Sequence, residues 1–194
     1  MVLFSAFSVA AEQSIGSFLY RVHHGDAPGS GNGVRLAPIA RLLSVAHDGC
    51  FMRGNSEAEL RQWAESEHGS PASPEQLKGF QSEYATLIGG WTLHSELGAI
   101  AVIQSALKEP VRGAVCSLTA ELPTEEQYKE FRAEFEKLYS TTVAEEADKP
   151  DQRVDRYWIN RAEGPPVKVT IVYTRSVRIV TIRMIHGNVR PLGL

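Results

Sequence analysis

The chain has 194 residues, a net charge of −3, and hydrophobic and charged fractions of 43% and 22%. A chain of this length can bury a substantial core, and its composition excludes a disordered or fibrous protein. The longest apolar stretch, residues 97–106, has about half the length that a membrane-spanning helix needs. We therefore expect a globular protein without a membrane partner.

The N-terminal residues contain part of the pattern of a secretory signal. An apolar stretch precedes Ser8, Val9 and Ala10, three small residues that resemble a cleavage site. However, no Lys or Arg occurs before Arg21, and the apolar stretch is shorter than in most signals of this class. The sequence therefore predicts a cytoplasmic protein, with secretion as the alternative.

The chain has two cysteines, Cys50 and Cys116. Two thiols are too few for a disulfide framework or for a four-cysteine zinc site. We expect both to be buried and reduced, as in a cytoplasmic protein, and a single disulfide between them remains open.

The first ninety residues show mainly the hydrophobic spacing of helices. Apolar residues three or four apart, and capping pairs such as Ser56 with Glu59, mark where these helices begin. We expect helices over residues 4–22, 38–49, 57–69 and 77–88. Residues 18–22 also fit a short strand. Residues 25–33, with four glycines and a proline, predict a loop.

From Trp91 onward the pattern changes to that of strands, with one long helix among them. Alternating or continuous apolar residues predict strands over residues 91–97, 114–122, 153–160, 167–174 and 177–185. Residues 98–107 fit either a strand or a buried helix. Thr124 and Gln127 have the spacing of a capping box for a helix over residues 125–147, which would bury Phe131 and Phe135.

Helices followed by strands favour an α+β protein over an alternating α/β protein. We expect a mainly helical region, residues 1–90, packed with an antiparallel sheet, residues 91–194, that one long helix backs. The two regions are expected to form one compact domain. The sequence shows no internal repeat.

Charge is unevenly distributed along the chain. Residues 1–150 contain 12 Lys or Arg and 20 Asp or Glu, a balance of −8, whereas residues 151–194 contain 8 and 3, a balance of +5. Basic residues interleaved with aromatic ones are typical of a binding surface on a sheet. The four most favoured contact residues are Arg175, Arg178, Arg183 and Trp158.

A basic surface with aromatic residues predicts a non-catalytic binding or assembly protein that uses its C-terminal sheet. The partner would be an acidic protein surface or a second copy of the chain. The net negative charge of the chain makes nucleic acid a less favoured partner. Arg178 and Arg183 differ in parity, so a flat strand cannot present both on one face.

The alternative hypothesis is a small-molecule enzyme. His23, His24 and Asp26 lie beside the glycine-rich loop, and an imidazole with a carboxylate can act as a general base. Their spacing matches no metal-binding motif, and the loop lacks the lysine of a nucleotide-binding loop. We therefore expect neither a metal nor a cofactor.

Overall fold

The structure of the chain, a computed structural model, describes residues 38–74, 77, 80, 83–96, 98–109 and 113–187. The helical elements are α2 (Pro38–Ser44), η1 (Val45–Phe51), α3 (Glu57–Ser66) and α5 (Glu125–Leu138). The strands are β1 (Ser70–Pro71), β2 (Ala85–Ser95), β3 (Gly98–Leu107), β4 (Gly113–Glu121), β5 (Glu145–Asp148), β6 (Gln152–Ile159), β7 (Val167–Thr174) and β8 (Ile179–Gly187).

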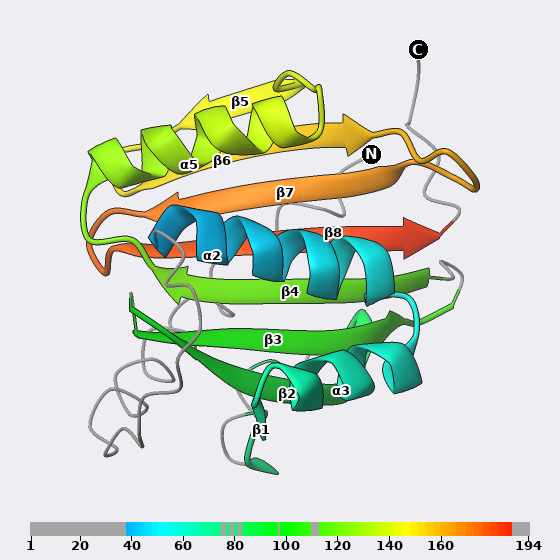
Figure 1. Cartoon of the computed structure of the whole chain (residues 1–194). Coiled ribbons are helices and arrows are strands. Elements are labelled where there is room, and N and C mark those ends of the chain that lie inside the picture. The colour runs from blue at the N-terminus through cyan, green and yellow to red at the C-terminus, as the bar shows by residue number, and fades with distance from the viewer. Residues whose placement is uncertain are drawn as a thin grey trace.

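The strands form one eight-stranded antiparallel sheet in the order β1-β2-β3-β4-β8-β7-β6-β5. Of the helices that the structure describes, α2, η1, α3 and α5 lie against the same face of this sheet (Figure 1). We call this side the helix face and the opposite side the outer face. The mixed α+β class expected from the sequence is therefore confirmed.

The order of the strands divides the sheet into two equivalent halves. In each half a helix precedes four consecutive strands that pair as a meander: α3 with β1 to β4, and α5 with β5 to β8. The halves join where β4 pairs with β8, and η1 contacts both of these strands. The chain thus contains a structural repeat that is not detectable as a repeat in its amino-acid sequence.

Helix α5 forms as its capping residues predict. The Thr124 side chain accepts a hydrogen bond from the Gln127 backbone, and the Gln127 side chain accepts one from the Thr124 backbone. Phe131 and Phe135 are fully buried, as expected. The helix ends at Leu138, and Ser140 follows with a φ of 48°, so the helix predicted to reach residue 147 is wrong at its C-terminal end.

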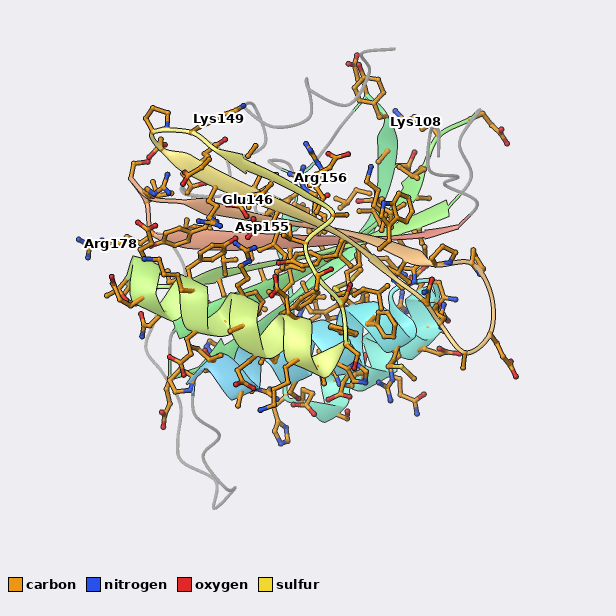
Figure 2. The ribbon with its side chains drawn as sticks, turned by 90° about the horizontal axis from the view of Figure 1, so that it is seen from above. Lys108, Glu146, Lys149, Asp155, Arg156 and Arg178 are labelled. Atoms are coloured by element: carbon orange, nitrogen blue, oxygen red, sulfur yellow. A yellow bond between two sulfur atoms is a disulfide. The ribbon has the colours of Figure 1, made fainter. Side chains whose placement is uncertain are left out.

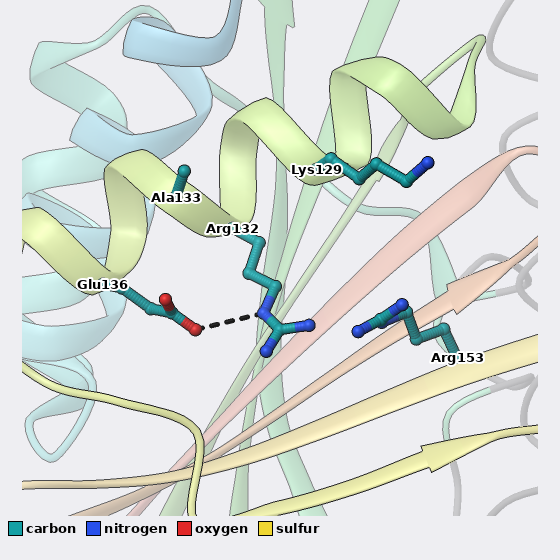
Figure 3. A pocket seen from close by; sticks show the side chains of 5 residues that line it. All are labelled: Lys129, Arg132, Ala133, Glu136 and Arg153. Carbon is teal, nitrogen blue, oxygen red and sulfur yellow. Dashed lines mark hydrogen bonds and ion pairs between the residues drawn. The ribbon is translucent and has the colours of Figure 1, made fainter.

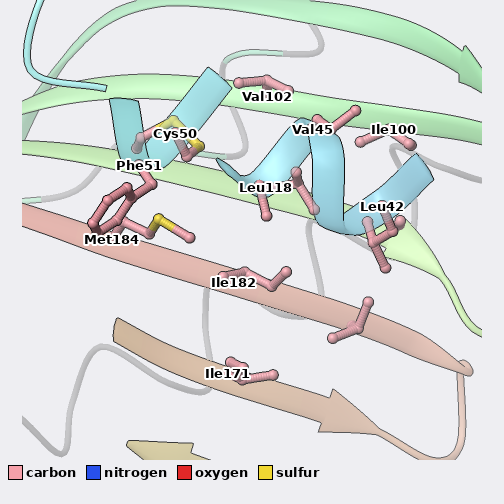
Figure 4. Packing of buried hydrophobic residues seen from close by; sticks show 14 of the residues in the cluster. Leu42, Val45, Cys50, Phe51, Ile100, Val102, Leu118, Ile171, Ile182 and Met184 are labelled. Carbon is pink, nitrogen blue, oxygen red and sulfur yellow. A yellow bond between two sulfur atoms is a disulfide. The ribbon is translucent and has the colours of Figure 1, made fainter. Parts of the chain in front are cut away.

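The core lies between the helix face and the helices. Figure 4 shows side chains of α2 and η1, among them Leu42 and Val45, directed at residues of the central strands such as Leu118 and Ile182. These four residues are fully buried. Aliphatic burial of this kind contributes roughly 1.5–3 kcal/mol for each large side chain, so it is the main force that holds the helices on the sheet.

Two further expectations about the helices are wrong. The region 1–90 is not mainly helical where the structure describes it, because β1 and the first half of β2 fall within it. Tyr84 lies in a turn and Leu87 in β2, although both share helical spacing with Phe80. The sheet is also not backed by one long helix, since α5 shares the helix face with α2, η1 and α3.

The predicted strands of the C-terminal half are confirmed. In β7, Val169 and Ile171 face the core, and their register partners in β8 are Met184 and Ile182. The pairing of β7 with β8 is continuous and contains no bulge. Apolar residues point to both faces of the sheet in β8. This is explained by the first half of the strand, which is covered on both faces, since residues Ile179 to Ile182 are all buried.

Small residues leave room on the outer face. Phe80 packs against Ala99, Ala101 and Ile179 on this side of the sheet. A Cβ atom added to Gly90 would lie 2.6 Å from a side-chain carbon of Leu77, so Leu77 packs closely over Gly90 in this structure. Leu77 and Phe80 therefore cover part of the outer face near β2 and β3.

The N-terminal predictions, the helix over residues 4–22 and the loop over residues 25–33, lie outside the described residues. The same is true of His23, His24 and Asp26.

Candidate interaction surface

Register places three cationic side chains on the outer face. Arg156 in β6 is opposite Thr170 in β7, which is opposite Arg183 in β8. In the next cross-strand row, Trp158 is opposite Lys168. Figure 2 shows Arg156 on the side of the sheet away from the helices. We call Arg156, Trp158, Lys168, Thr170 and Arg183 the outer-face patch.

The side chains of the outer-face patch lie close together. The Lys168 ammonium nitrogen is 5.6 Å from the centre of the Trp158 ring, within the range of a cation–π contact. Arg156 forms an ion pair of 2.6 Å with Glu145 at the sheet edge. Burial lowers the pKa of Lys168, and the neighbouring Arg156 guanidinium lowers it further. Like charges are therefore held near one another here.

The four predicted contact residues are divided between two places. Trp158 and Arg183 belong to the outer-face patch and are partly exposed. Arg175 and Arg178 lie in the turn between β7 and β8, where Arg178 is exposed with a φ of 56°. Figure 2 shows Arg178 at the end of the sheet and Arg156 over its middle.

Arg175 connects the β7–β8 turn to the β5–β6 turn. Its guanidinium donates hydrogen bonds to Asp148 at 2.7 Å and to the carbonyl of Lys149 at 2.5 Å, and it lies 3.4 Å from a carboxylate oxygen of Glu125. The hydrogen bond to Asp148 raises the pKa of Arg175. These partners within the chain indicate that Arg175 joins the β5–β6 turn to the β7–β8 turn.

A second charged cluster lies under α5 on the helix face. Asp155 in β6 is fully buried and accepts a hydrogen bond from the Tyr128 hydroxyl. Its carboxylate oxygens are 3.5 Å from Arg132 Nε and 3.6 Å from Arg153 Nε. Burial, with this hydrogen bond to Asp155, raises the pKa of Tyr128, so the hydroxyl keeps its proton and remains a donor.

The outer carboxylates complete this cluster. Glu136 lies 3.0 Å from Arg132 and also accepts a hydrogen bond from Tyr157 at 3.0 Å. Glu146 in β5 pairs with both guanidinium groups, at 3.2 Å from Arg132 and 2.5 Å from Arg153. The cluster joins α5 to the two last strands of the sheet edge and leaves little net charge.

Cys50 and Cys116 form a disulfide, and both are fully buried. The expectation of two reduced cysteines is therefore wrong. The bond connects η1 to β4 beneath His186, whose Nε2 donates a hydrogen bond of 2.8 Å to the Cys50 carbonyl. Burial lowers the pKa of His186. A Cβ atom on Gly54 would lie 2.7 Å from that of Cys116, so the bond is tightly enclosed.

The residues of the enzyme hypothesis, His23, His24 and Asp26, lie outside the part of the chain that the structure describes. No three His, Cys, Asp or Glu side chains within that described part are grouped so that they could hold a metal ion. Among the same residues, no helix is long and apolar enough to cross a membrane.

No family model, curated protein or solved structure matches the chain. The site is therefore interpreted from its own chemistry. The sequence pattern singled out Trp158 and Arg183 as expected contacts, and the register adds Arg156 and Lys168 as residues on the same face. Parity was the usable signal: Arg156 and Trp158 share a face of β6, and Lys168 and Thr170 share a face of β7.

Proposed function

We propose that this chain is a non-catalytic binding protein that contacts an acidic protein surface through the outer-face patch. The observation that carries the proposal is that Arg156, Lys168 and Arg183 share one face of three adjacent strands with Trp158. Arginine and tryptophan are the residues most enriched at the energetic centres of protein interfaces.

The charge of the patch favours an acidic partner. Arg156 lies close enough to Lys168 to lower its pKa, which means that the two cations repel one another in the free protein. A carboxylate placed between them would relieve this repulsion, and the partial burial of both would strengthen the new contact relative to one in water. Within the patch, Arg156 also pairs with Glu145 at 2.6 Å.

A folded acidic surface suits the patch better than nucleic acid does. The patch offers one aromatic ring, whereas platforms for single strands stack successive bases on several rings. The exposed face of α5, on the other side of the sheet, carries Glu126, Glu130 and Glu134. A second copy of the chain would offer such an acidic helix to the patch.

Reversing two charges of the patch tests this function. We expect Arg156→Glu combined with Arg183→Glu to leave the chain folded and to slow association with its partner by tenfold or more, because charged residues at an interface act mainly on the association rate. The partner is first identified by co-purification of the native protein and mass spectrometry. Association is then measured by surface plasmon resonance at two salt concentrations.

Arg178→Glu serves as the matched control, because it changes the charge of an exposed arginine outside the patch. It should alter the association rate by less than about threefold, because Arg178 lies in the turn at the end of the sheet and salt screens exposed charges outside the contact. Equal effects of the control and the double variant would overturn the proposal. So would partner binding that does not weaken as salt is raised.

We also propose that the protein works in an oxidising compartment, so that secretion replaces the cytoplasm as the expected location. Disulfides persist in secreted and periplasmic proteins and are rare in the cytosol, where thiols are kept reduced. Blocking free thiols in denatured cell extract before reduction should leave Cys50 and Cys116 unlabelled by the blocking reagent, because unfolding exposes both positions, which are buried in the folded chain. Quantitative labelling of both cysteines at this step would contradict the proposal.

A further inference from the structure

A pocket of about 370 Å³ opens between α5 and β6, on the helix face of the sheet and away from the outer-face patch. Its lining residues are Lys129, Arg132, Ala133, Glu136 and Arg153. Figure 3 shows the guanidinium groups of Arg132 and Arg153 pointing toward each other, with Lys129 extending on the same side from an earlier turn of the helix.

Each of the three cations keeps a donor for a ligand. Arg132 uses Nε on Glu136 and Nη2 on Glu146, so its Nη1 has no bond within the described chain. Arg153 uses Nη2 on Glu146, and its Nη1 is 3.9 Å from Asp148, too far for a hydrogen bond. Lys129 forms no ion pair with any residue that the structure describes.

Two atoms behind the pocket also lack full hydrogen bonding. Arg153 Nε and Asp155 Oδ1 are buried without a hydrogen-bond partner and face one another at 3.6 Å. The carboxylates of Glu146 and Asp155, together with Glu136 at the pocket wall, fix the orientation of the guanidinium groups. Side chains fixed in this way lose little freedom when a ligand binds, which lowers the cost of binding.

From this geometry we propose that the pocket binds a phosphate group. Its oxygens would accept hydrogen bonds from Arg132 Nη1, Arg153 Nη1 and Lys129 Nζ, the planar guanidinium groups being well suited to phosphate. A phosphate dianion can use all three donors, whereas a single carboxylate has fewer oxygens to share among them. The small side chain of Ala133 leaves the space open. This inference does not rest on the partner proposed for the outer face.

The test is a titration of the full chain with sodium phosphate in HEPES buffer at pH 7.5, followed by the NMR shifts of backbone amides. Saturable shifts are expected at Lys129, Ala133 and Arg153, and sodium chloride at the same ionic strength should not reproduce them. A phosphoserine peptide forms a second arm. Tighter binding of this peptide than of inorganic phosphate indicates a protein-borne phosphate, and equal binding indicates a free one.

Substitutions at two exposed positions of α5, Ala133 and Lys129, test the proposal without altering the buried charged residues. Ala133→Glu places a carboxylate in the pocket and should weaken phosphate binding by tenfold or more, whereas Ala133→Gln, of nearly equal size, should stay within about threefold. Lys129→Gln should weaken binding by about three- to tenfold, and Lys137→Gln, outside the pocket, should not. Shifts that chloride reproduces, or an unchanged affinity in both Ala133→Glu and Lys129→Gln, would overturn the proposal.

Discussion

Replacing Asp155 with alanine is expected to lower the free energy of unfolding by about 3–5 kcal/mol, the range for removing one partner of a buried ion pair. The substitution would leave the Tyr128 hydroxyl without its acceptor and would remove the carboxylate that lies between Arg132 and Arg153. Urea unfolding monitored by circular dichroism measures the change. Asp155→Asn keeps the shape and should cost less, because the amide oxygen can still accept from Tyr128.

Glu145→Ala is the control for this substitution. Glu145 is also paired with an arginine, but its side chain is 68% exposed, and exposed pairs contribute roughly 0–1 kcal/mol. A loss below about 1 kcal/mol for Asp155→Ala would show that the cluster under α5 does not hold the helix to the sheet.

Removal of the disulfide is expected to lower stability by about 4 kcal/mol. The bond joins residues that are 66 positions apart, and closing a loop of this length restricts the unfolded chain by about that amount. The measurement compares urea midpoints of the oxidised chain and of chain that was reduced while unfolded and then refolded in reductant.

The double variant Cys50→Ala, Cys116→Ala shows whether the reductant acts through this bond. Its unfolding midpoint should not respond to reductant at all. Since the bond anchors η1 to β4, we expect the reduced chain to lose the packing of η1 before the sheet melts. Equal midpoints for the oxidised and reduced chains would contradict a stabilising role for the bond.

Much of the sheet could be predicted because its strands have a clear period. In β7 alternate residues such as Val169 and Ile171 face the core, and in α5 the spacing of Phe131 and Phe135 marks the buried side. Each of these patterns is local, because the side chains that define it belong to a single element. Local periodicity therefore sufficed for the strands of the C-terminal half and for the start of α5.

The errors have tertiary causes. Residues 145–148, with the sequence EEAD, have poor β-propensity, and they form β5 because they pair with β6 and because Glu146 bonds to Arg132 and Arg153. The end of α5 could not be placed without that pairing. Likewise, Leu87 fits a helical spacing with Phe80, but the ladder with β3 makes it part of a strand.

The two halves of the fold and the disulfide were hidden for a similar reason. The equivalent strands β4 and β8 share a position in the sheet but not their residues, so a search for repeated letters cannot detect them. Cys50 and Cys116 meet only because η1 lies across the junction of the halves. For the binding residues, parity could have grouped Arg156 with Trp158, but only the strand order brings Arg183 close to them.

The claim that the outer-face patch contacts an acidic protein is tested most directly by site-specific cross-linking. A photoreactive amino acid is placed at Thr170, between Arg156 and Arg183 in the register, or at Glu130 on the exposed face of α5 as the matched position. We expect an adduct with an acidic protein from Thr170 that disappears when Arg156 and Arg183 are reversed to glutamate. An adduct from Glu130 alone, or one from Thr170 that survives the charge reversal, would contradict the account.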